Sequence, residues 1–138
     1  MRVIGFNFKQ IFIEKKKEVT QNIKVGFNIE IEEVKKQEVD LFKDQDVFGF
    51  DFTFKIDYEP NYAELKFKGT ILAVAEDKEI AKDIEEKWKN KQLPEDIHLG
   101  IRNTILSKCN IKALQLEEDI GLPVHMPAPR LTREQPQV

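Results

Sequence analysis

Cysteine, glycine and long apolar runs are scarce in this chain, and each scarcity excludes a class of protein. The 138 residues include one cysteine, six glycines and one tryptophan. A single cysteine, Cys109, cannot close an internal disulfide or form a zinc site of the usual Cys/His kind. No apolar run approaches the ~18 residues that a membrane span needs, and no apolar signal segment follows Met1 and Arg2. We therefore expect a cytoplasmic protein without a membrane partner.

The charge balance excludes a general affinity for nucleic acid. The chain carries 22 basic and 25 acidic residues, for a net charge of −3, whereas phosphate backbones attract a basic surface. With 41% hydrophobic residues the chain is too apolar to be intrinsically disordered, and its length suits one domain. We predict a single domain over residues 1–130 and a flexible C-terminal tail over residues 131–138.

No residue pattern predicts catalysis, a metal or a cofactor. The six glycines are isolated, so none forms a phosphate-binding loop. His98 and Cys109 fall 11 residues apart in one predicted helix, about 16 Å along its axis, which is too far for a nucleophile and its base. Asp40, Asp44 and Asp46 lack the glycine and the distant glutamate of a calcium loop. We expect no catalytic residue, no metal site and no cofactor.

The N-terminal half of the chain alternates apolar and polar residues with period two, which is typical of strands with one buried face. Four such segments cover residues 4–13, 23–31, 48–58 and 65–73. The alternation shifts phase near Lys9, which predicts a bulge. Residues 59–62 form a turn signal, so the last two segments are expected to pair as an antiparallel hairpin.

The phenylalanines of these segments have two interpretations. An RNA-binding sheet stacks bases on a few exposed aromatic side chains framed by basic residues. Here the opposite strand face carries Asp51 and Asp57, so we interpret the phenylalanine rows as core. The segment over residues 33–46 stays open: Leu41 and Phe42 could anchor a crossover connection or belong to an extra short strand.

The C-terminal half predicts two helices and an extended arm. Asp77 is a plausible N-cap for a first helix that ends before Pro94, and Pro94 opens a longer second helix that ends at Gly121. An apolar stripe along the second helix would cover the phenylalanine face. Three prolines within seven residues then favour an extended arm over residues 122–130, lying in a groove of its own or a neighbouring subunit.

This order of elements resembles the SecB-like fold: an α+β domain in which two helices cover a four-stranded antiparallel sheet, followed by an extended Pro-rich C-terminal arm. Locally, residues 8–13 are similar to the opening strand of that family, residues 101–108 to its interface helix, and residues 122–127 to its extended Leu/Pro segment. The family includes chaperones that hold unfolded polypeptides along apolar grooves. The resemblance implies a cytoplasmic homo-oligomer, a dimer or a tetramer, that binds extended polypeptide without chemistry.

Two functions follow as hypotheses. The first is a holdase-like chaperone that binds extended apolar segments. The second is a structural or adaptor subunit that recognises one dedicated folded partner. An enzyme or an RNA-binding protein fits the sequence less well. The peptide-binding candidates are Leu41, Phe42, Leu122, Val124 and Met126. The second helix is apolar over more than one face, which predicts contact between subunits. The interface candidates are Ile97, Ile101, Ile105 and Leu106.

Overall fold

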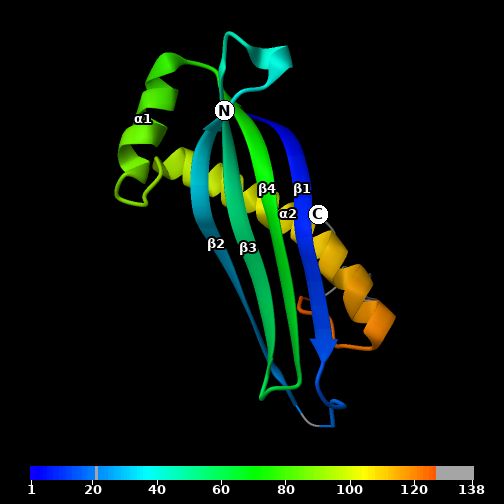
Figure 1. Cartoon of the computed structure of the whole chain (residues 1–138). Helices are drawn as coiled ribbons and strands as arrows, with labels where there is room; N and C mark the ends of the chain where they lie inside the picture. Colours follow the sequence, from blue (N-terminus) through cyan, green and yellow to red (C-terminus); the bar gives the residue numbers. More distant parts are fainter. Residues whose placement is uncertain (21, 127–138) are drawn as a thin grey trace, which may run out of the picture.

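Four strands and two helices form two layers in the computed structural model, which describes residues 1–20 and 22–126. The elements are β1 (Arg2–Lys15), β2 (Lys24–Gln37), η1 (a 3-10 turn, Asp40–Phe42), β3 (Asp46–Glu59), β4 (Ala63–Ala75), α1 (Lys78–Trp88) and α2 (Glu95–Ile120). The sheet is antiparallel throughout, in the order β1-β4-β3-β2. Figure 1 shows α2 crossing one face of the sheet diagonally, while α1 lies beside one end. The predicted α+β class is confirmed, and the expected tail over residues 131–138 lies outside the described residues.

The strand pairing follows the apolar alternation. Phe54 of β3 pairs with Phe67 of β4 and with Ile29 of β2, so these buried side chains lie on the same face of the sheet. β1 joins the outer edge of β4, and its register shifts between Phe8 and Gln10. This shift is the predicted bulge. It lets the even-numbered apolar residues before it and the odd-numbered ones after it lie on one face.

Local signals set the turns and helix ends as expected. In the β3–β4 hairpin Asn61 adopts a φ of 56°, which asparagine tolerates. The side chain of Asp77 accepts hydrogen bonds from the backbone N–H groups of Glu79 and Ile80 at 2.8 and 3.1 Å, which caps α1. Gly121 ends α2 in the left-handed region, with a φ of 70°.

The core lies between α2 and the phenylalanine face. The buried positions of α2 recur every four residues along one stripe of the helix: Ile101, Ile105, Cys109, Ala113 and Glu117. Where the helix crosses β2, the Arg102 guanidinium donates a hydrogen bond to the carbonyl of Ile29 at 3.0 Å. A helix that crosses diagonally covers only part of a rectangular sheet, so both edge strands keep exposed apolar residues.

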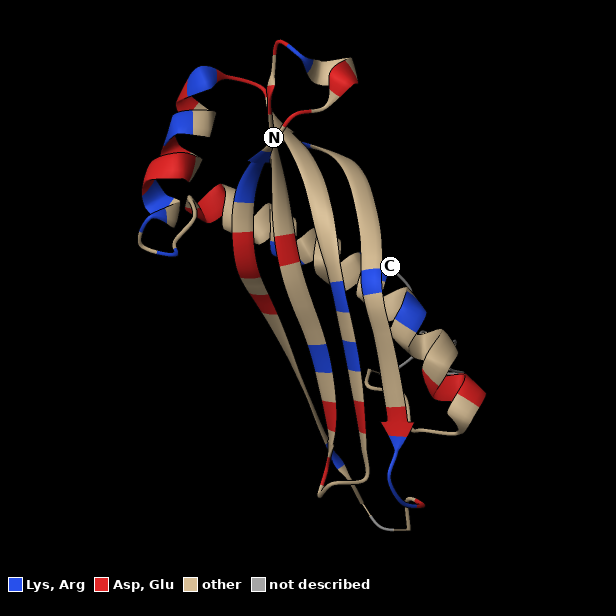
Figure 2. Cartoon of the chain, viewed as in Figure 1, with Lys and Arg blue, Asp and Glu red and all other residues tan. Residues whose placement is uncertain are grey.

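The other face of the sheet is charged. Figure 2 shows Lys, Asp and Glu distributed along the strands. Several pair across strands, among them Lys9 with Asp51 at 3.4 Å and Lys55 with Glu64 at 3.6 Å. Such partly exposed pairs contribute little to stability, about 0–1 kcal/mol each. This face is therefore solvated, and the functional candidates lie on the edges and at the two ends of the sheet.

Candidate functional site

The first candidate region is the loop over residues 38–45, for which we keep the short name crossover although it joins the adjacent strands β2 and β3 at one end of the sheet. Neither alternative left open by the sequence holds: β2 and β3 pair as an antiparallel hairpin, so the loop crosses no other strand, and it contains η1 and no extra strand. Figure 1 shows it projecting beyond the strands. The η1 turn is closed by a hydrogen bond from the Phe42 N–H to the Val39 carbonyl at 2.8 Å. Leu41 at its centre is 89% exposed, so this large apolar side chain has almost no cover from its own chain.

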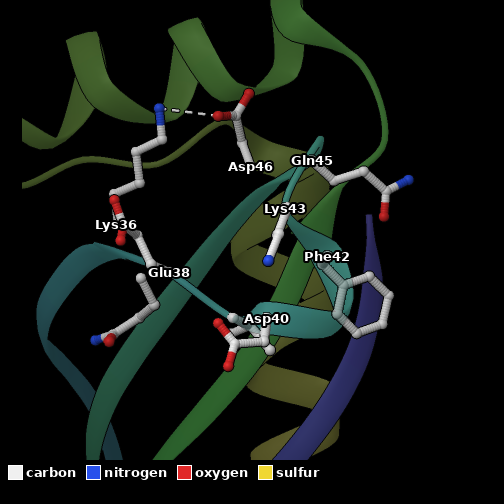
Figure 3. Close-up of a pocket in the computed structure, with 9 residues that line it drawn as sticks. Lys36, Glu38, Asp40, Phe42, Lys43, Gln45 and Asp46 are labelled. Atoms are coloured by element: carbon white, nitrogen blue, oxygen red, sulfur yellow. Dashed lines mark ion pairs between the residues drawn. The ribbon is translucent and has the colours of Figure 1, made fainter.

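A hollow of about 670 Å³ lies beside the crossover. Its lining is mostly charged: Lys36 and Lys43 with Glu38, Asp40 and Asp46. Figure 3 shows Phe42 on one side of the hollow and the Lys36–Asp46 ion pair on the other. The Arg2 guanidinium lies 5.9 Å from the centre of the Phe42 ring, a cation–π contact that fixes this aromatic side chain near β1. Phe42 is thus partly covered, whereas Leu41 does not line the hollow.

Ion pairs hold this end of the sheet together. Asp46, at the start of β3, receives Lys36 of β2 at 2.8 Å and Lys78 of α1 at 3.4 Å. The hydrogen bond from Lys36 lowers the pKa of Asp46 below its ordinary value, and the same contact raises the pKa of Lys36. Lys36 also lies 3.6 Å from Glu85. Ion pairs with exposed lysines, which salt can screen, therefore join the end of β2 and the start of β3 to α1.

The second candidate region is the arm, described here as residues 122–126. It leaves α2 at Gly121, where the Leu122 N–H donates to the Glu117 carbonyl at 2.8 Å. Leu122 is 6% exposed and belongs to the core, whereas Val124 is 50% and Met126 40% exposed. Figure 1 shows the arm, in orange, turning back from the end of α2. Leu122 therefore packs against its own chain in this conformation, and only Val124 and Met126 present apolar surface.

A buried polar cluster fastens the arm. Glu117 is fully buried, and its carboxylate accepts hydrogen bonds from the Tyr58 hydroxyl and from Nδ1 of His125, the latter at 2.9 Å to Oε1. The His125 Nε2 lies 2.8 Å from the side-chain oxygen of Asn110. Burial, and then the neighbouring Glu117, raise the pKa of Tyr58 above its ordinary value, so the hydroxyl keeps its proton and donates. Both ring nitrogens of His125 therefore lie within hydrogen-bond distance of side-chain oxygens of α2.

This polar cluster decides whether the arm docks. Ordering five backbone residues costs on the order of 5–10 kcal/mol, at about 1–2 kcal/mol per residue. Burying the one large apolar side chain, Leu122, contributes only about 2 kcal/mol. The remaining stabilisation comes from hydrogen bonds, which are worth about 1.5–3 kcal/mol each where one partner is charged. The docked arm is thus held by polar contacts together with hydrophobic burial.

Sequence reasoning missed Glu117 and its partners. Tyr58 counted as the last member of an apolar row, and His125 has no acidic neighbour close in sequence. One signal was present: the four-residue stripe of buried positions along α2 ends on Glu117. A carboxylate in an apolar stripe requires buried partners. The sequence could show this requirement, but only the fold brings Tyr58 and His125 to it.

The structure separates the residues expected to bind peptide. Leu41 and Phe42 lie at the end of the sheet where β3 begins at Asp46, and the arm lies at the end marked by Tyr58. These two positions are 12 residues apart along β3, on the order of 40 Å at about 3.3 Å per residue. The crossover and the arm therefore form two separate apolar contacts and do not share one groove.

The residues expected at a subunit interface fall into two groups, one buried in the core and one partly exposed. Ile101 and Ile105 are buried beneath the sheet in the core of their own chain, so we assign them to the core. Ile97 and Leu106 are partly buried and keep some surface. The most exposed apolar side chains of α2 are Leu99 and Ile111, which the expected interface did not include.

The edge strands carry further apolar surface. Within the part of the chain that the structure describes, no strand pairs with the outer edge of β1 or β2. Val3, Ile11 and Phe12 are exposed on β1, and Phe27 is 55% exposed on β2. Phe27 ends a row of aromatic rings that runs through buried Phe54, with ring centres 6.2 Å apart. An edge strand with free backbone groups and apolar neighbours can accept another strand.

Cys109 and His98 lie in different surroundings. Burial raises the pKa of the Cys109 thiol to about 12, whereas His98 is exposed. Within residues 1–20 and 22–126 no cluster of three or more His, Cys, Asp or Glu side chains could hold a metal ion. Among the same residues no helix is long and apolar enough to cross a membrane.

The chain has a SecB-like fold. It superposes with a TM-score of 0.57 on the SecB-like chaperone Rv1957 of Mycobacterium tuberculosis, whose structure was solved in complex with a ChAD peptide from the HigA1 antitoxin Rv1956. The match covers 95% of this chain and 89% of that chain, at 10% sequence identity. No protein-family model matches the chain, and no characterised protein matches its sequence. The likeness therefore lies in the fold, and the predicted resemblance to the SecB-like fold is confirmed.

Proposed function

We propose that this protein is a non-enzymatic, cytoplasmic chaperone that binds extended apolar segments of other polypeptides and works as a homo-oligomer. The observation that carries the proposal is Leu41, which is 89% exposed at the centre of η1, within a loop that projects beyond the sheet. An isolated exposed leucine is ordinary on a protein surface. Here the next residue, Phe42, is partly covered, and exposed Val124 and Met126 add apolar surface at the other end of the sheet.

Two contacts separated by about 40 Å suit a long unfolded client. A client that binds at the crossover has its remaining segments held near the arm, so the second contact forms at a high effective concentration. Each contact alone can then be weak. The fold supports this interpretation, because the SecB-like chaperone that it matches was solved with a bound peptide.

The experiment is a titration of the protein into fluorescein-labelled, reduced and carboxymethylated lactalbumin, followed by anisotropy. We expect micromolar or better binding, and several-fold weaker binding by Leu41→Ser, because the client loses one apolar contact. Asp44→Ser, an exposed neighbour on the same crossover, is the matched control and is expected to bind like the parent protein. Equal binding by all three proteins would remove the crossover from the site.

A second candidate function is an adaptor for one dedicated partner. It is favoured by the fact that the matching chaperone was solved with a peptide from one particular antitoxin. This function predicts a stoichiometric complex on affinity purification and no affinity for lactalbumin or other unrelated unfolded proteins. The same titration therefore separates the two functions.

The homo-oligomer part of the proposal rests on uncovered apolar surface. The free edge of β1 carries Val3, Ile11 and Phe12, and the outer side of α2 carries Leu99 and Ile111. A second copy could cover either surface through two-fold symmetry. Light scattering at micromolar concentration is expected to give a multiple of 16.2 kDa, and a mass of 16.2 kDa would contradict it.

A further inference from the structure

The arm is docked in an unusual way: its polar side chain points inward while two of its apolar side chains point outward. The side chain of His125 is 3% exposed and bonded to Glu117 and Asn110, whereas Val124 and Met126 on either side are about half exposed. In an extended chain, alternate residues lie on the same side. Leu122, Val124 and Met126 would then form one apolar row, but the docked arm buries Leu122 and leaves the row incomplete.

We propose that the Glu117–His125 contact is a latch that holds the arm closed, and that opening it presents Leu122, Val124 and Met126 together to a client polypeptide. The proposal rests on the function proposed above and adds its regulation. In the closed arm Leu122 is buried, so the client cannot contact it. In the open arm all three apolar side chains are exposed, and water hydrates Glu117 and His125 after their hydrogen bond breaks.

The placement of the partners supports a latch confined to the arm. Asn110 and Glu117 are both on α2, seven residues or two helical turns apart, so the arm runs back along the helix and needs no other element to move. Tyr58 reaches Glu117 from β3 and remains bonded to it when His125 leaves. Gly121, in the left-handed region at the end of α2, is the natural hinge.

Closure also lowers the apparent affinity for the client. A client that binds the open arm must compete with the latch, and its apparent Kd rises as the open fraction falls. A substitution that opens the latch therefore tightens binding, which is opposite to the effect of damaging a binding residue. This opposite sign separates a latch from a merely structural contact.

The test compares the full-length parent protein with His125→Ala in two measurements. Hydrogen exchange of the backbone amides over residues 121–126 reports arm opening, and anisotropy with labelled carboxymethylated lactalbumin reports binding. We expect exchange in the arm to rise about tenfold or more, with β3 and β4 unchanged, because only local contacts are lost. We expect the Kd for the client to fall about threefold or more.

Two further variants serve as a negative control and as a second test of the same contact. His98→Ala removes the exposed histidine at the other end of the same helix and is expected to change neither measurement. Glu117→Gln keeps the shape of the side chain and removes its charge, so we expect intermediate opening and intermediate tightening. It also serves if His125→Ala does not fold.

The outcomes are distinct. Faster arm exchange together with tighter binding supports the latch. Unchanged arm exchange overturns it, whatever the binding. Faster exchange with equal or weaker binding overturns the regulatory role and leaves the proposed function standing. If the parent protein and every variant fail to bind the client, the proposed function fails, and the regulatory role fails with it.

Discussion

The two ends of the sheet are held by different means. At the crossover end, the exposed lysines Lys36 of β2 and Lys78 of α1 reach the largely buried carboxylate of Asp46, and the large apolar residue, Leu41, points into solvent. At the arm end, both partners of the contact, Glu117 and His125, are buried, and Leu122 is inside the core. Ion pairs with exposed lysines are screened by salt, whereas burial of both partners makes a contact costly to separate. The comparison teaches that the crossover presents its large apolar side chain to solvent, while the docked arm keeps its own inside the core.

The largest expected loss of stability follows from a substitution in the core, which lies between the two ends of the sheet. Phe54→Ala removes a fully buried ring that stacks on Phe67 with centres 5.9 Å apart, and is expected to lower the free energy of unfolding by about 3–5 kcal/mol. Urea denaturation measures this. Phe27→Ala, in the same aromatic row but 55% exposed, is the matched control, with an expected loss of less than about 1.5 kcal/mol. Equal losses would mean that Phe27 is covered in solution by another chain.

The next prediction compares the two ends directly. Leu122→Ala is expected to cost about 1–2 kcal/mol, because the arm can leave its site and so limits the loss to its own docking free energy. Leu41→Ala is expected to change the free energy of unfolding by less than about 0.5 kcal/mol. Both are measured by urea denaturation. A loss at Leu41 as large as that at Leu122 would show that the crossover is not open.

A smaller effect is expected at Asp46 and depends on pH. The pKa of Asp46 is lowered in the folded protein, so its contribution to stability is present above its ordinary value of 3.8 and is lost as pH falls through the lower folded value. The urea midpoint of Asp46→Asn is therefore expected below that of the parent protein at ~pH 7, and the difference is expected to shrink as acid protonates Asp46 in the folded protein. High salt shrinks the difference. A difference that persists at low pH would assign it to hydrogen bonding instead of charge.

No alkylation of Cys109 is expected in the native protein, because this residue lies on α2 beneath the sheet. Burial raises its pKa to about 12, so the native protein has almost no thiolate and resists iodoacetamide at ~pH 8. The same resistance is expected in His125→Ala, because opening the arm leaves the core intact. Mass spectrometry after labelling checks this, with urea-unfolded protein as the positive control. Labelling of native His125→Ala would show that the arm end opens together with the core.

Much of the fold was predictable because it depends on local chemistry. Period-two alternation placed all four strands, the phase shift at Lys9 located the bulge, and Asp77, Pro94 and Gly121 marked the helix ends. The candidate site was less predictable. Apolar residues of the crossover and the arm were both predicted to bind peptide, and nothing in a linear sequence shows that they lie at opposite ends of a long sheet.

The sequence by itself determined which residues form strands and helices, which faces are apolar, and that no common catalytic or metal motif is present. These properties follow from backbone sterics, periodicity and the residue types available within a few positions. Only the tertiary structure decided which apolar residues are covered and what a buried charge finds as a partner. Leu41 and Leu122 look alike in sequence, yet one is solvated and one is core. Glu117 becomes a latch only because antiparallel pairing places the end of β3 beneath α2, and the turn at Gly121 returns His125 to the same point.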